Sequence, residues 1–125
     1  MFLNPYDTVY HLLAARSRGD TAAALACYDT EAGVVVQPGT ITTGEAGIRR
    51  FTKTTMTQPI AFGDREIMEV DGIALHLSKW TLRPGGGPEI VGRTTDVLRR
   101  QPDGSWLMLI DNPWGVSVLD RTTAP

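Results

Sequence analysis

The sequence has few of the residues that hold metals or disulfides. Its 125 residues include one cysteine, Cys27, and two histidines, His11 and His76. A single cysteine excludes an internal disulfide framework and every zinc site built from several cysteines. Two histidines are also too few for the usual closed structural metal sites. We therefore expect no structural metal site, and the sequence implies no cofactor.

The chain also lacks an excess of basic charge and long apolar runs. Twelve Lys and Arg residues stand against 14 Asp and Glu residues, which gives a net charge of −2. Nucleic acids and anionic membranes bind basic surfaces, so neither is an expected partner. The longest purely apolar run, Trp106–Ile110, is far shorter than the about 20 residues of a membrane span. The start of the chain lacks the features of a secretory signal. We therefore expect a cytoplasmic protein.

The length and the apolar content fit one domain. A chain of 125 residues, 42% of them hydrophobic, can bury a core without disulfides or metals. We therefore treat residues 1–125 as a single domain.

The first half of the sequence predicts three helices. Pro5 favours the first turn of a helix, and Gly19 favours its C-terminal cap. Asp20 is a good N-cap for a second, alanine-rich helix. Thr42 stands in capping-box spacing with an acidic residue before a third amphipathic segment. The second helix is predicted over Thr21–Asp29, and the third is predicted to end near Met56.

Strands are predicted mainly after Pro59. Before it, Val34–Val36 predicts one short strand. Asp71–Gly72 is a hairpin signal, and the glycine-rich segment 84–88 is predicted to be a loop. The longer strands are predicted over Ile60–Val70, Ile73–Arg83, Glu89–Arg100 and Ser105–Asn112. Helices followed by a meander of antiparallel strands predict an α+β fold, with the helices packed on one face of a curved sheet.

Two carboxylates stand in unusual places. Asp96 lies in the middle of a predicted strand, where aspartate is disfavoured. Asp111 directly follows an apolar run. Burial would raise the pKa of either group and indicate a pocket acid. The same sequence pattern is expected if these aspartates form ion pairs with Arg93, Arg99 or Arg100, so both interpretations stay open.

Four other side chains are candidates with simpler alternatives. His76, in mid-strand, could be a base, although a hydrogen-bonded wall residue is the commoner role for such a histidine. Cys27 has no nearby charge to lower its pKa and is expected to be a buried, inert thiol. Trp80 and Trp114 could wall a pocket, or they could belong to the core or to a subunit interface.

The order of several short motifs resembles the nuclear transport factor two-like superfamily, and in particular its SnoaL-like and ketosteroid isomerase-like proteins. The resemblance covers nearly all of residues 5–115. It implies a cystatin-like, cone-shaped fold: a curved, mostly antiparallel sheet with three N-terminal helices on its concave face. The motifs are Arg18-Gly19-Asp20, Pro38-Gly39, the segment 44–51, the segment 94–100 and Asp103-Gly104-Ser105-Trp106.

The resemblance also bears on activity, because ketosteroid isomerases use three polar residues. Gln37 stands where their catalytic aspartate precedes a proline, and Leu12 stands where they have a tyrosine. Only Asp96 matches, at the position of an acid that the apolar site of those enzymes keeps protonated. The resemblance therefore predicts a pocket without the ketosteroid isomerase mechanism.

Three interpretations remain open at this stage, and the third is metal-dependent catalysis, which would need His76, Asp96 and Asp111 on one centre. In the first, an apolar pocket binds a small hydrophobic molecule and carries out a cofactor-free isomerisation, cyclisation or dehydration. Asp96 would donate a hydrogen bond to the developing negative charge, and Asp111 or His76 would act as the base. In the second, the chain is a non-catalytic ligand-binding, dimerisation or accessory module. A homodimer formed through the sheet is expected, because three helices can cover only one of its faces. The residues expected to line the pocket are Leu12, Tyr28, Gln37, Phe51, Trp80, Leu98 and Trp114.

Overall fold

Three α-helices and a six-stranded sheet make up residues 2–54 and 61–120, the part of the chain that the computed structural model describes. The helices are α1 (Pro5–Ser17), α2 (Thr21–Leu25) and α3 (Gly44–Thr54). Two 3₁₀ turns, η1 (Pro84–Gly86) and η2 (Gly115–Leu119), complete the described elements. The strands are β1 (Tyr28–Gln37), β2 (Thr40–Thr43), β3 (Ala61–Val70), β4 (Ile73–Leu82), β5 (Ile90–Arg100) and β6 (Trp106–Asp111).

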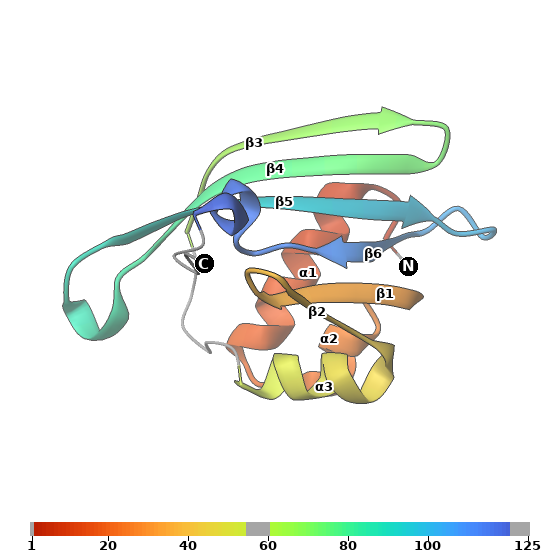
Figure 1. The fold of residues 1–125 in the computed structure, drawn as a ribbon. Helices are drawn as coiled ribbons and strands as arrows, with labels where there is room; N and C mark the ends of the chain where they lie inside the picture. The colour runs from red at the N-terminus through yellow and green to blue at the C-terminus, as the bar shows by residue number, and fades with distance from the viewer. Residues whose placement is uncertain (1, 55–60, 121–125) are drawn as a thin grey trace.

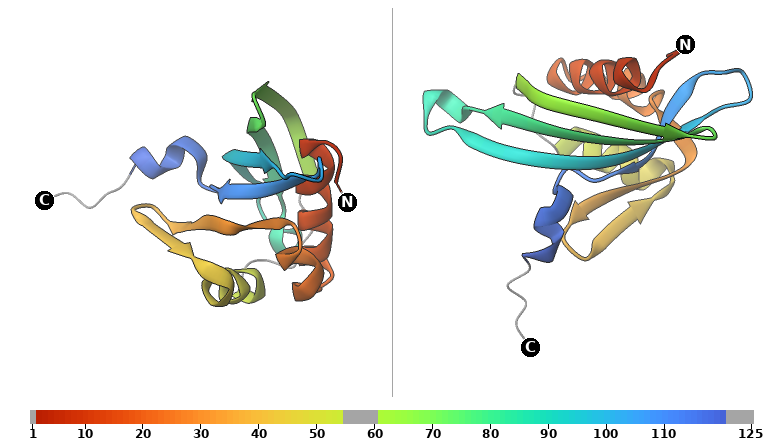
Figure 2. Two further views of the ribbon diagram at one scale, coloured as in Figure 1. Left: turned by 90° about the vertical axis from the view of Figure 1, so that its right-hand side faces the viewer. Right: turned by 90° about the horizontal axis from the view of Figure 1, so that it is seen from above.

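The sheet is curved, and the helices lie on one side of it. The strand order is β2-β1-β6-β5-β4-β3, and every neighbouring pair is antiparallel except β1 and β6. Helix α1 crosses behind the sheet and packs on β6, while α3 packs on β1 and β2 (Figures 1 and 2). The predicted α+β fold, with three helices on the concave face of a mostly antiparallel sheet, is confirmed.

Local signals placed α1 and the start of α2 correctly. Asn4 caps α1 by accepting a hydrogen bond from the Asp7 backbone N–H, and Pro5 occupies the first turn. Gly19 follows the end of the helix with a φ of +72°, a conformation that glycine adopts without strain. Asp20 then caps α2 by accepting from the Ala23 N–H at 3.0 Å. Pro5 and the Asp20 cap were therefore sufficient evidence for the two helix starts.

The predicted helix over residues 21–29 is too long, and the strand predicted over residues 34–36 is too short. Helix α2 ends at Leu25, and β1 begins at Tyr28. The Met108 N–H donates to the Cys27 carbonyl at 2.8 Å, so the chain joins β6 as soon as α2 ends. Pairing with a strand 80 residues away along the chain outweighs the helix propensity of the alanines.

The remaining boundaries agree closely with the prediction. Strands β4, β5 and β6 each begin and end within one residue of the predicted limits. Strand β2 and the turn η2 were not predicted, and Thr42 belongs to β2 instead of capping the third helix. Ile60 and Met56, the predicted start of one strand and end of the third helix, lie outside the described residues.

A β-bulge in β6 decides which face of the sheet Asp111 joins. Leu98 pairs with Met108, but Val97 pairs with Ile110, so Leu109 is an extra residue on β6. The alternation of side chains therefore shifts by one position. Strict alternation along β6 would place Ile110 on the same face as Trp106 and Met108. Instead Ile110 is 39% exposed on the outer face, and Asp111 is buried on the inner face.

The core lies between the helices and the inner face of the sheet. Among the described residues, the buried apolar side chains come from all three helices and from four of the six strands or their flanking residues. No helix among the described residues is long and apolar enough to cross a membrane. The most deeply buried side chains include Leu12, Cys27, Val34, His76, Leu98 and Met108.

Candidate functional site

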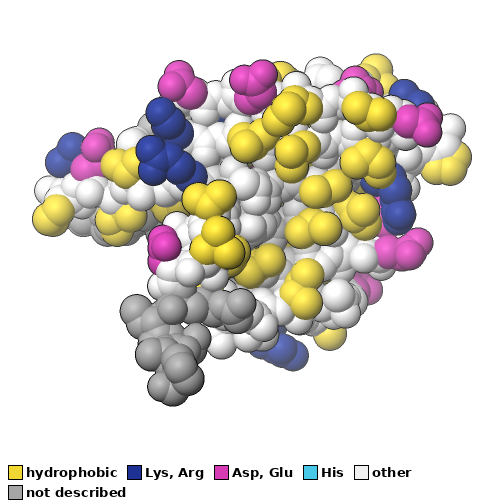
Figure 3. Space-filling view, turned by 45° about the horizontal axis from the view of Figure 1, so that its top comes forward, with side chains coloured by type: hydrophobic (Ala, Val, Ile, Leu, Met, Phe, Trp, Pro, Cys, Tyr) yellow, Lys and Arg dark blue, Asp and Glu magenta, His cyan; other side chains and the backbone are white. Residues whose placement is uncertain are grey.

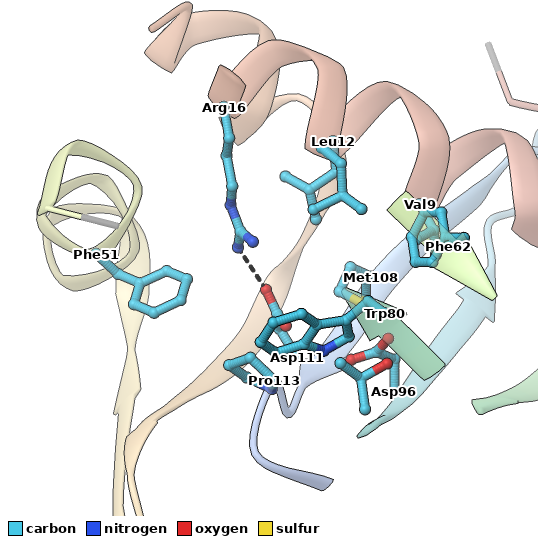
Figure 4. A pocket seen from close by; sticks show the side chains of 12 residues that line it. Val9, Leu12, Arg16, Phe51, Phe62, Trp80, Asp96, Met108, Asp111 and Pro113 are labelled. Carbon is cyan, nitrogen blue, oxygen red and sulfur yellow. Dashed lines mark hydrogen bonds and ion pairs between the residues drawn. The ribbon is translucent and has the colours of Figure 1, made fainter. Parts of the chain in front are cut away.

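A small cavity of about 100 Å³ lies between α1, α3 and the concave face of the sheet (Figure 4). Eight of its twelve lining residues are apolar or aromatic, and three of the remaining four are charged. Such a site can hold an apolar ligand and orient it through a few polar groups. The apolar lining is Val9, Leu12, Leu13, Phe51, Phe62, Trp80, Met108 and Pro113, and the polar lining is Arg16, Thr94, Asp96 and Asp111.

Asp96 is held in the cavity wall by two hydrogen-bond donors. It lies on the inner face of β5 and is 4% exposed. Its Oδ1 accepts from the backbone N–H of Asn112, and its Oδ2 lies 3.0 Å from His76 Nδ1. Burial raises the pKa of Asp96 to about 6, although both hydrogen bonds favour its charged form. The carboxyl group is therefore fixed in orientation and can change protonation state near neutral pH.

His76 orients the Asp96 carboxyl group, and Arg65 determines which ring nitrogen of His76 donates to it. His76 is fully buried on β4, directly opposite Asp96 in the sheet register. Its Nε2 lies 3.3 Å from Arg65 Nε, which can only donate. Nε2 must therefore be the acceptor, and Nδ1 carries the proton that points at Asp96. The guanidinium of Arg65 is fixed by two aromatic rings, at 4.1 Å from the Phe62 centroid and 4.8 Å from the Tyr6 centroid.

A second polar group in the cavity is built on Asp111. Arg16 Nη2 lies 2.6 Å from Asp111 Oδ2, and the same oxygen accepts from the Tyr28 hydroxyl. Burial is the largest single influence on Arg16 and lowers its pKa, but the Asp111 carboxylate and the Tyr28 hydroxyl together outweigh burial and keep that pKa above its usual value. Burial and the same carboxylate raise the pKa of Tyr28. Arg16 Nε is buried with no hydrogen-bond partner among the described residues.

The structure brings five of the predicted site residues to the cavity wall. Leu12, Phe51, Trp80, Asp96 and Asp111 all line it. The alternative for the two aspartates, an ion pair with Arg93, Arg99 or Arg100, does not occur in the described part of the chain. Asp96 contacts a histidine, Asp111 pairs with Arg16, and Arg99 pairs instead with Asp29.

The other five predicted residues lie elsewhere. His76 and Tyr28 stand behind the wall, each hydrogen-bonded to a carboxylate that lines it. Leu98 is fully buried in the core, and Trp114 lines a separate outer hollow. Gln37 differs most from the prediction: its side chain is exposed and lies 3.4 Å from Thr40 Oγ1. The reason is that β1 ends at Gln37 and turns back into β2.

The prediction missed Arg16, although the sequence carried a signal for it. Arg16 follows Leu12 by four residues and Val9 by seven, so it falls on the apolar stripe of α1. A charged residue on such a stripe must meet a buried partner. That partner could not be identified, because the bulge that turns Asp111 inward has no local sequence signal. Among the described residues, no cluster of three or more His, Cys, Asp or Glu side chains could hold a metal ion.

Comparisons with known proteins identify other proteins with the same architecture. No protein-family model and no curated protein matches the sequence. A candidate ketosteroid isomerase from Shewanella frigidimarina superposes with a TM-score of 0.69 at 16% identity, covering 83% of this chain and 89% of its own. A protein of unknown function with a cystatin-like fold, from Nostoc punctiforme, gives 0.72 at 14% identity, covering 88% and 91%. A candidate dehydratase of the nuclear transport factor two-like family, from Streptomyces avermitilis, gives 0.66 at 18%, covering 82% and 87%. These superpositions establish a shared fold, and at identities this low they establish the fold alone.

Proposed function

Because the chain has the nuclear transport factor two-like fold, with a cavity on the concave side of its sheet, we propose that it binds a small, largely apolar molecule and transfers a proton at a carbonyl or hydroxyl group of that ligand. Two proteins of the same fold are described as a candidate isomerase and a candidate dehydratase. Both reaction types move a proton next to such a group. The detailed support comes from the cavity itself.

The observation that carries the proposal is the state of Asp96. Its carboxyl group is buried, aimed by two donors and adjacent to an apolar cavity. A general acid or base is most effective when its pKa lies near the working pH, and burial brings the pKa of Asp96 to about 6. Both ring nitrogens of His76 are already engaged. We therefore assign His76 to positioning and Asp96 to proton transfer.

The charges in the cavity favour a neutral ligand. Two carboxylates, Asp96 and Asp111, face one guanidinium, that of Arg16. A carboxylate on the ligand would meet net repulsion, whereas a carbonyl oxygen can accept from the guanidinium N–H groups that do not bind Asp111. In this arrangement Asp96 removes a proton from the carbon next to the carbonyl, and Arg16 stabilises the enolate oxygen until the proton returns. No water is consumed, so the step is an isomerisation or an exchange.

Deuterium exchange tests this function without knowledge of the natural substrate. In D₂O the protein should exchange the α-protons of butan-2-one and 4-phenylbutan-2-one faster than buffer does, and Asp96→Asn should lower that rate about 100-fold or more, the usual contribution of a general base. Mass spectrometry measures the exchange. Asp64→Asn is the matched control, because Asp64 is 93% exposed on β3. Equal exchange by the protein and by Asp96→Asn would contradict the proposal. Binding without exchange would favour a non-catalytic ligand-binding module.

We also propose that two copies of the chain associate through the outer face of the sheet. Hydrophobic side chains gather on this face, opposite the helices (Figure 3). Monomers rarely expose apolar patches of this kind, and a two-fold axis would bury the face on both copies. The exposed apolar residues of the patch are Met68, Val70, Ile73, Leu75 and Ile110.

The dimer is expected at micromolar concentration, where light scattering should give twice the chain mass. Leu75→Glu should halve that mass, because a dimer would bury the new charge without a partner. Leu3→Glu is the control, since Leu3 is 67% exposed and lies outside the patch. A monomeric parent protein would contradict this proposal.

A further inference from the structure

A second hollow lies directly outside the cavity. Its volume is about 350 Å³, compared with about 100 Å³ for the cavity itself. Phe51, Trp80 and Pro113 line both spaces, so these three residues form the partition between them. The outer hollow also has its own wall, which includes Val36, Val91 and Trp114.

The position of the Trp80 indole depends on Gly92. In the sheet register Trp80 has Phe62 on one neighbouring strand and Gly92 on the other. A Cβ atom at Gly92 would overlap the six-membered ring of Trp80, so the indole lies directly over the glycine backbone. A strand glycine often marks such a close approach. Because Gly92 has no side chain, the Trp80 ring rests against the backbone of β5, in the wall that both spaces share.

The two volumes limit what can bind. Small-molecule sites usually measure about 300–1,000 Å³, and a cavity of about 150 Å³ holds a benzene molecule. The inner cavity, at about 100 Å³, admits only a compact group of a few heavy atoms. Any larger ligand that reaches Asp96 must therefore extend past Trp80 into the outer hollow.

The outer hollow is suited to a flat apolar group. Trp114 is 39% exposed, and its Nε1 donates to the Val35 carbonyl at 3.2 Å, which fixes the plane of the ring. Trp80, Phe51 and Pro113 add further flat faces. Aromatic rings pair favourably with such faces, beyond the gain from burial alone.

We propose that the site has two chambers divided by Trp80 and takes a bipartite ligand, with a compact neutral ketone or alcohol group in the inner cavity and an aromatic ring in the outer hollow. This inference rests on the proposed function and adds its substrate class. It also assigns Gly92 as a specificity-determining residue, because the size of that residue sets the position of the partition.

Two ketones that differ only by a phenyl ring test the proposal. Titration followed by ligand-observed NMR should show that 4-phenylbutan-2-one binds the protein at least 10-fold more tightly than butan-2-one. Trp114→Ala should reduce this preference to less than 3-fold while leaving butan-2-one affinity unchanged. Because Trp114 is partly exposed, this variant should fold.

Two glycine variants test the partition. Gly92→Ala forces the Trp80 ring to move and should also reduce the preference for the phenyl compound to less than 3-fold. Gly63→Ala is the matched control, since a Cβ atom at Gly63 meets Lys79 at an ordinary 3.6 Å. It should keep the full preference.

The outcomes separate the two proposals. Equal affinity for the two ketones, or a preference that survives both Trp114→Ala and Gly92→Ala, overturns the two-chamber site. In that case, exchange of butan-2-one that depends on Asp96 would leave the proposed function intact. If neither ketone binds and neither exchanges, the proposed function fails, and the two-chamber site fails with it.

Discussion

Asp111→Ala is expected to lower the free energy of unfolding by about 3–5 kcal/mol, the usual cost of removing one partner of a buried ion pair. The side chains of Arg16 and Asp111 are 10% and 6% exposed. Without the Asp111 carboxylate, the Arg16 guanidinium would remain buried among Leu12, Phe51 and Met108 and would have lost its ion-pair partner. Urea unfolding at pH 7 measures the loss.

A double variant separates the value of the pair from the cost of breaking it. Arg16→Met with Asp111→Asn removes both charges, and the amide oxygen can still accept from the Tyr28 hydroxyl. We expect this variant to recover more than half of the stability that Asp111→Ala loses, because exchanging a buried pair for neutral groups is often nearly neutral. In the double-mutant cycle made of Arg16→Met, Asp111→Asn and the double variant, strictly additive losses would show that the two charges are not coupled.

The second large effect concerns Asp96 and pH. Its pKa is raised by burial from 3.8 to about 6 in the folded protein. The folded state therefore holds this proton more tightly than the unfolded chain does. The stability that comes from the bound proton is fully present below about pH 4 and is lost as pH rises through about 6. By linkage, the loss between pH 4 and pH 7 is about 2–3 kcal/mol.

Asp96→Asn isolates this contribution because it does not titrate. The free energy of unfolding of the variant, minus that of the parent protein, should rise by about 2–3 kcal/mol from pH 4 to pH 7. A constant offset is expected as well. His76 and Asn112 both donate to Asp96, and an amide oxygen can satisfy only one of the two carboxylate positions. Urea unfolding at several pH values measures both effects. A difference that stays constant with pH would show that the carboxyl group is not desolvated.

The comparison of sequence and structure separates local from non-local information. Helix α1 and the start of α2 were predictable because Pro5, Gly19 and Asp20 act on their own backbone neighbourhood. The full length of β1 was not, because it depends on a parallel pairing with β6. The hairpins after Ile73 were predictable, since their turns and their strands are close in sequence.

The same distinction applies to the site. Asp96 could be singled out because aspartate is unusual in mid-strand, and it does line the cavity. The pairing of Asp111 with Arg16 joins residues 95 positions apart, and no local pattern connects them. Gln37 was expected in the cavity on the basis of its place before a proline, but the observed turn into β2 leaves it exposed.

The bulge at Leu109 affects the chemistry of the cavity, because it decides which side chains of β6 face inward. In a regular strand successive side chains alternate between the two faces, and a bulge interrupts this alternation, so each residue after it lies on the face opposite to the one that strict alternation predicts. The extra residue in β6 places Asp111 inside and Ile110 outside. If the same residues ran without the bulge, in regular alternation, Ile110 would lie beside Arg16 and Asp111 would lie on the apolar outer face. One backbone irregularity, the bulge at Leu109, therefore sets both the charge inside the cavity and the apolar character of the outer face.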